Sequence, residues 1–210
     1  MKNRKNLLSL AAVAALMVLA GCASKPDSYY TLASAVPAAE AAPSTLGTAA
    51  PLYIELAPVA VPERLARPQM VVGRPGGSVQ VDVLEQHRWA ASFENELQDA
   101  LASGIAARLG ALDVTKGGRP SAQPVWRIAV QVRRFDAVDG GRVDAGFNWT
   151  LRRSDEPRTL VCQLDAGEAV AGGIDAVAQG AQRITAAAAA AIARSVNAAR
   201  ADPSATLCAA

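Results

Sequence analysis

Two runs of alternating apolar and polar residues, separated by a glycine turn, constrain the fold of this chain more than any other feature. The apolar members occupy every second position before and after the turn: Trp126, Ile128, Val130 and Val132, then Val143, Ala145, Phe147, Trp149 and Leu151. A period of two places them on one face of a strand. Asp139-Gly140-Gly141 between the runs is typical of a hairpin turn. The pattern predicts an antiparallel hairpin with one buried face, and residues 159–164 are expected to add a third strand.

Two other segments have the period of a helix. In both, apolar residues recur every three or four positions: Trp89, Phe93, Leu97, Leu101, Ile105 and Leu109 in the first, and Ile174, Val177, Ala181, Ile184, Ala188, Ile192 and Val196 in the second. Gly110 is a typical helix stop. The alanine run at residues 186–191 combines high helix propensity with little bulk. We therefore expect two helices, the second suited to close packing on a sheet.

Shorter apolar segments predict further strands at residues 52–56, 69–72 and 78–84. Strands and helices do not alternate regularly along the chain, so a doubly wound nucleotide-binding fold is not indicated. Two helices on a mixed sheet predict an α/β domain. We place this single domain at residues 51–200, followed by a C-terminal tail at residues 201–210.

The N-terminus has the organisation of a lipoprotein leader. A positively charged segment at residues 2–5, with Lys2, Arg4 and Lys5, precedes an uncharged apolar run at residues 7–20. This run is shorter than the roughly 20 residues that a spanning helix needs. Leu19-Ala20-Gly21-Cys22 then matches a lipobox, with small residues before a nucleophilic thiol. We predict a signal peptide at residues 1–21 and acylation of Cys22, with chains such as palmitate that anchor the protein without crossing the membrane.

The residues after Cys22 bear on location and charge. Residues 22–50 are interpreted as the acylated cysteine, a polar tether, a short β-prone patch at residues 29–32 and a linker. Ala23 stands where inner-membrane lipoproteins tend to carry Asp, which favours the periplasmic face of the outer membrane over the inner membrane. Loss of the three basic leader residues leaves 18 basic side chains against 19 acidic ones. Such a chain has no global field to attract nucleic acid.

Cys162 and Cys208 would then lie in an oxidising compartment. A disulfide between them is one interpretation. The other is a buried free thiol, because Cys162 shares strand parity with Leu160 and Leu164. The sequence leaves both open.

The chain offers little material for catalysis. His87 is the single histidine, and a nucleophilic triad or a metal site needs more partners than it has nearby. We interpret it as a polar residue at the start of the first helix. The sequence predicts no enzyme, no metal site and no cofactor.

Residues 58–75 are rich in proline and arginine. An ordered proline-rich segment loses less entropy on binding, so it is suited to docking. Arg67, Pro68, Gln69 and Met70 are the candidate partner-binding residues within it. The alternative is a rigid connector between strands.

Several segments together resemble one family. They are Cys22 followed by Tyr29-Tyr30-Thr31-Leu32, then Leu56-x-Pro58-Val59-x-Val61-Pro62, Arg67-Pro68-Gln69-Met70-Val71, Arg88-Trp89-Ala90 and Arg134-Phe135-Asp136. In this order they resemble the ABC-type transport auxiliary lipoproteins, which include the paraquat-inducible-protein-C-like lipoproteins. The resemblance implies a single three-layer α/β domain similar to anticodon-binding and TolB N-terminal domains.

The resemblance also implies a role. It suggests a non-catalytic outer-membrane lipoprotein of an intermembrane lipid transport system, docking the periplasmic conduit to the outer membrane. The implied partners are a periplasmic protein with mammalian-cell-entry domains and, through it, a permease and an ATPase; a homo-oligomer would suit a tubular partner. The alternatives are a periplasmic lipid-binding shuttle and an envelope-integrity or assembly lipoprotein without a transporter.

Overall fold

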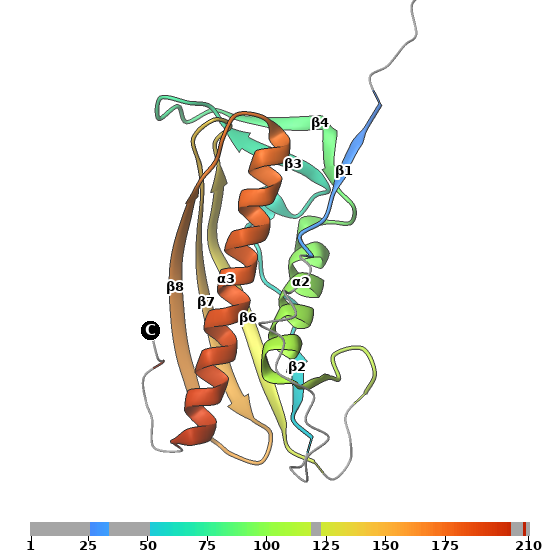
Figure 1. Ribbon diagram of the computed structural model, residues 1–210, viewed down its shortest axis with the longest axis vertical. Helices are drawn as coiled ribbons and strands as arrows, with labels where there is room; N and C mark the ends of the chain where they lie inside the picture. Colours follow the sequence, from blue (N-terminus) through green and yellow to red (C-terminus); the bar gives the residue numbers. More distant parts are fainter. Residues whose placement is uncertain (1–25, 34–50, 119–122, 203–207, 209–210) are drawn as a thin grey trace, which may run out of the picture.

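The computed structural model describes residues 26–33, 51–118, 123–202 and 208, and shows an α/β fold with two mixed sheets and two long helices (Figure 1). One sheet has the strand order β5-β2-β6-β7-β8 and the other has the order β1-β4-β3. The strands are β1 Ser28–Tyr30, β2 Tyr53–Leu56, β3 Gln69–Gly73, β4 Val81–Trp89, β5 Leu112–Asp113, β6 Val125–Ala137, β7 Arg142–Arg153 and β8 Thr159–Ala169. The helices are α2 Phe93–Leu109 and α3 Ile174–Ala201, and a 3-10 turn, η1, spans Glu63–Leu65.

The β6–β7 hairpin forms the centre of the five-stranded sheet. The two strands pair antiparallel, from Trp126 opposite Arg153 to Ala137 opposite Val143. Gly140 has a φ of 66° in the turn between them, a conformation that favours glycine. β8 pairs with β7 along its whole length. The hairpin and the third strand that the alternation predicts are confirmed, with β8 extending five residues beyond the expected end.

Both helices pack against the buried face of this sheet and against each other (Figure 1). Small residues allow the close approach. A Cβ added to Gly104 of α2 would lie 3.0 Å from the Cβ of Ala189 in α3, and one added to Gly180 would lie 2.5 Å from Val170 Cγ1. The small residues of α3 therefore pack directly against α2 and the sheet, and no open space remains beside Gly180 and Ala189. The predicted α/β class with two main helices is confirmed.

The structure corrects the boundary between the strand predicted at residues 78–84 and the first predicted helix. β4 runs to Trp89, so Trp89 and His87 lie in a strand and not at the start of a helix. The helix begins at Phe93, where the Ser92 side chain accepts a hydrogen bond from the Asn95 backbone N–H. A serine at this position is a typical N-cap. Apolar spacing alone therefore predicts a helix start about one turn too early, at Trp89 instead of Phe93.

The strands are divided between two sheets, where a single mixed sheet is expected from the sequence. β4 pairs antiparallel with β3 and parallel with β1. The small sheet joins the large one through a bridge between Gly73 and Val138. The likeness to anticodon-binding and TolB domains stays a prediction.

Candidate functional site

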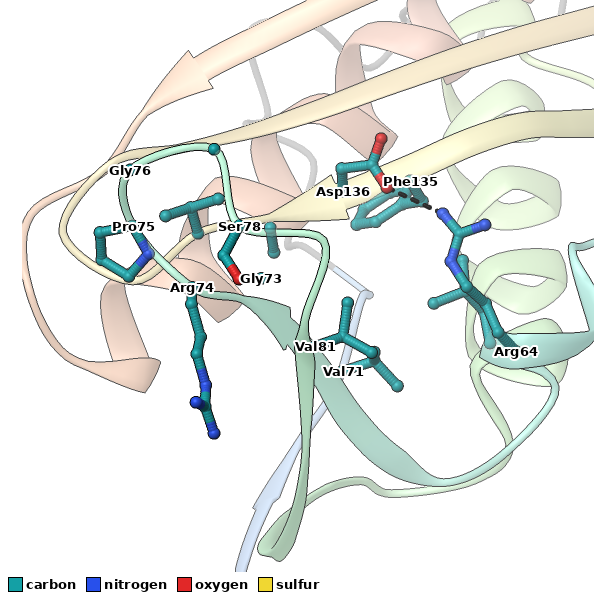
Figure 2. A pocket seen from close by; sticks show the side chains of 14 residues that line it. Arg64, Val71, Gly73, Arg74, Pro75, Gly76, Ser78, Val81, Phe135 and Asp136 are labelled. Atoms are coloured by element: carbon teal, nitrogen blue, oxygen red, sulfur yellow. Dashed lines mark hydrogen bonds and ion pairs between the residues drawn. The ribbon is translucent and has the colours of Figure 1, made fainter.

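A cleft lies between the β3–β4 hairpin and the end of β6 (Figure 2). Its volume is about 250 Å³. Six apolar side chains form most of its walls: Leu65, Val71, Val81, Phe135, Ala137 and Val138. The cleft therefore brings the neighbouring segments η1, β3 and β4 together with the end of β6, which lies about 50 residues further along the chain.

Strand pairing explains why valines reach this cleft. Val71 stands opposite Val83, and Gly73 stands opposite Val81. Because side chains alternate along a strand, these residues share one face of the hairpin. The opposite face carries Met70 and Val72 into the core. Figure 2 shows Val71 and Val81 directed toward the same space.

Charged residues around the cleft are already paired. Arg64 and Asp136 form an ion pair of 2.8 Å across one side of it (Figure 2). Arg74 donates to Asp82 through Nε at 3.0 Å and Nη2 at 2.7 Å. These hydrogen bonds hold the pKa of Asp82 below its usual value and raise the pKa of Arg74 above its own. The surroundings of the cleft are consequently close to electrically neutral.

This lining is suited to apolar contact. No histidine, cysteine, lysine or glutamate lines the cleft, and Ser78 supplies its single hydroxyl group. The volume lies below the 300–1,000 Å³ that is typical of small-molecule pockets. A few apolar side chains of another protein fit such a space, whereas a whole phospholipid does not. Within the described parts of the chain, no group of three or more His, Cys, Asp and Glu residues could hold a metal ion.

The candidate partner-binding residues lie beside the cleft, where their backbone has a structural role. The Arg67 carbonyl accepts from the Phe93 N–H at 3.3 Å, and the Pro68 carbonyl accepts from the Trp89 N–H at 2.7 Å. These bonds hold the corner between β4 and α2. Met70 is 2% exposed and belongs to the core, so its side chain is not accessible to a partner. The side chains of Arg67 and Pro68 are exposed, and Gln69 is half-buried.

Sequence reasoning missed a polar cluster that fixes β1. The Tyr30 hydroxyl donates to Asp175 Oδ1 at 2.7 Å and lies 2.9 Å from His87 Nδ1. Burial and the hydrogen bond to Asp175 raise the pKa of Tyr30. The cluster joins three segments separated by up to 145 residues, which no local pattern could reveal. We name Tyr30, His87 and Asp175 the β1 clasp.

Of the three cysteines named as candidate sites, the structure describes Cys162 and Cys208. Cys22 lies outside the described residues. Cys162 and Cys208 are joined as a disulfide, with Cα atoms 5.6 Å apart, a separation that disulfide geometry requires. Cys208 is thereby held against β8, at the edge of the large sheet.

No helix in the described ranges combines the length and apolar character that a membrane span requires. The family of ABC-type transport auxiliary lipoprotein components matches residues 30–193. The match begins in β1 and ends in α3, so it covers both sheets and the cleft.

Solved structures that share this fold include two crystal structures. One is of an uncharacterized protein with 19% identity and a TM-score of 0.62, covering 82% of this chain and 99% of that chain. The other is a DUF330 protein from Xanthomonas campestris with 14% identity and a TM-score of 0.60, covering 85% of this chain and 99% of that chain. No curated protein matches the chain. At these identities the likeness shows the fold alone.

Proposed function

Because the chain belongs to the family of ABC-type transport auxiliary lipoprotein components, we propose that it docks the periplasmic conduit of a lipid transporter to the outer membrane. The anchor in this proposal is an acylated Cys22, exposed after removal of residues 1–21. The body is the domain at residues 51–200, together with the β1 segment that packs on it.

The observation that carries this proposal is the apolar cleft beneath the β3–β4 hairpin. Its walls are mostly apolar, and the charged side chains beside it are paired with one another. A site of this kind contributes binding energy through buried apolar area. We propose that it receives apolar side chains of a periplasmic protein with mammalian-cell-entry domains, which in turn contacts the permease and the ATPase.

The packing of α3 disfavours the lipid-shuttle alternative. A shuttle needs an apolar cavity, and the alanine-rich helix is the segment with the least side-chain bulk. Gly180 and Ala189 instead lie in tight contact with the sheet and with α2. The small residues are therefore used for close helix packing.

Affinity purification from native envelopes tests the proposal. The acylated full-length chain is extracted in a mild detergent that leaves the transporter assembled, and co-purifying proteins are identified by mass spectrometry. We expect a mammalian-cell-entry-domain protein in the purified complex. Val81→Glu should reduce its recovery about tenfold, because the new charge is desolvated in an apolar contact.

Val161→Glu is the matched control. Val161 is an exposed valine in a strand, as Val81 is, but it lies on β8 and outside the cleft. The Val161→Glu variant should recover as much of the mammalian-cell-entry-domain protein as the wild type does. Equal loss in both variants, or no such partner with the wild-type chain, would contradict the proposal.

A further inference from the structure

The exposed apolar side chains of the molecule are concentrated on the small sheet. Six large hydrophobic residues are exposed within the described parts of the chain: Tyr29, Val79, Val81, Val83, Leu112 and Val161. The first four belong to the small sheet and its hairpin loop. Val79, in that loop, is 99% exposed and is the most exposed of all. A valine in this position contributes nothing to the core.

The hairpin tip carries no charge. Residues 75–80 read Pro-Gly-Gly-Ser-Val-Gln. Gly76 and Gly77 take φ values of 83° and 74° in the turn, which glycine adopts without strain. The flanking Arg74 is neutralised by Asp82 and also donates to the Gln80 side chain at 2.9 Å. The tip can therefore leave bulk water without desolvating an unpaired charge.

The hairpin lies at the end of the molecule where the described chain begins. Figure 1 shows the start of β1 and the β3–β4 hairpin at the same end of the long axis. β1 runs parallel to β4, with Ser28 opposite His87. Cys22 precedes Ser28 by six residues, which span at most about 20 Å when fully extended. An acyl anchor on Cys22 therefore holds this end of the domain close to the bilayer.

We propose that the β3–β4 hairpin tip, residues 75–80, rests in the headgroup region of the anchoring membrane, with Val79 as its deepest side chain. The occupant of this surface is the lipid bilayer. The inference rests on the acylation of Cys22 that the proposed function also uses. It adds a second point of contact, which fixes the orientation of the domain. Residues 75–78 of the tip also line one wall of the cleft, so in this orientation the cleft lies next to the membrane surface.

A tryptophan at the tip tests this directly. The acylated full-length Val79→Trp protein is reconstituted into phosphatidylethanolamine–phosphatidylglycerol vesicles that contain brominated acyl chains. We expect a blue shift of its emission and about twofold more bromine quenching than in the wild type, consistent with insertion of about 5–10 Å into the boundary between headgroups and acyl chains. Trp89, Trp126 and Trp149 are buried in the protein and give a constant background.

Val161→Trp is the control, because Val161 is exposed on β8, away from the hairpin. It should show neither the shift nor the extra quenching. The inference is overturned if the Val79→Trp emission on vesicles equals that of a water-exposed indole. A shift that appears only when the mammalian-cell-entry-domain protein is added also overturns it, and would assign the tip to a protein contact. Because partner recovery is measured separately, failure here leaves the proposed function intact.

Discussion

The large and small sheets of this protein differ in how much of their apolar surface is buried. In the large sheet, β6 and β7 bury one face completely under two helices, and Phe147 is fully buried there. In the small sheet, Met70 and Val72 point into the core while Val81 and Val83 stay exposed on the other face. Burial of apolar surface stabilises a fold, and exposed apolar surface is available for association. We therefore interpret the large sheet as the scaffold and propose the small sheet as the contact surface.

Paired truncations in the two sheets test whether the large sheet carries the stability of the fold. Phe147→Ala should lower the free energy of unfolding by about 3–5 kcal/mol, because it leaves a cavity under the helices. Val81→Ala on the small sheet should change it by less than about 0.5 kcal/mol. Chemical denaturation monitored by circular dichroism measures both. Similar losses in the two variants would show that the small sheet is also part of the stability core.

The Cys162–Cys208 disulfide adds to the scaffold. It closes a sequence separation of 46 residues, and a bridge of that length typically contributes about 2–4 kcal/mol. Cys208→Ser should lower stability by that amount, and reductant should affect the wild type but not the variant. Mass analysis after alkylation provides the check. Two freely alkylated thiols at these positions in unreduced native protein would be incompatible with the bridge.

Close packing of α3 gives a smaller effect. Gly180→Ala places a Cβ 2.5 Å from Val170 Cγ1, so the helix has to shift. We expect a net loss of about 1–3 kcal/mol from overpacking, although alanine is the better helix former by about 1 kcal/mol. Gln179→Ala, at the neighbouring exposed position, is the control and should be nearly neutral. A stabilised Gly180→Ala protein would show that the interface between α3 and the sheet can accommodate an added methyl group.

Disrupting the β1 clasp should give the smallest change in the free energy of unfolding, and this change should depend on pH. Tyr30→Phe removes its hydrogen bonds and should cost about 1 kcal/mol. The raised pKa means that the folded protein holds the Tyr30 proton more tightly than the unfolded chain. This stabilisation is complete below the ordinary pKa of 10.0 and is lost as the pH rises through the folded-state pKa.

Unfolding measured at a series of alkaline pH values checks this prediction. The stability difference between wild type and Tyr30→Phe should shrink above pH 10. Tyr29→Phe is the control, because Tyr29 is exposed on the same strand. A difference that stays constant with pH would contradict the role of the tyrosine proton.

The sequence predicts the scaffold better than the contact surface, for a physical reason. Alternation around Asp139-Gly140-Gly141 is a local signal, and it predicts both strands of the hairpin. The small sheet depends on pairing between β1 and β4, which are more than 50 residues apart. Such pairing is set by tertiary packing, and a short strand carries little periodicity of its own.

The start of α2 at Phe93 is marked in the sequence by capping residues. Trp89 and Phe93 are four residues apart, which suits a helical stripe, yet Trp89 ends a strand. Ser92 followed by Glu94 and Glu96 is the pattern of a capped helix start. Capping residues therefore define this start better than apolar spacing does. The β1 clasp left no comparable signal, because its three residues meet only in the folded chain.

Site-specific photocrosslinking in cells tests whether the small sheet contacts the partner protein. A photoreactive amino acid is placed at position 81 or at position 161 of the acylated full-length chain in cells that carry the assembled transporter. We expect position 81 to crosslink to the mammalian-cell-entry-domain protein and position 161 to give no crosslink to it. Crosslinks from position 161 alone, or from neither position, would contradict the assignment.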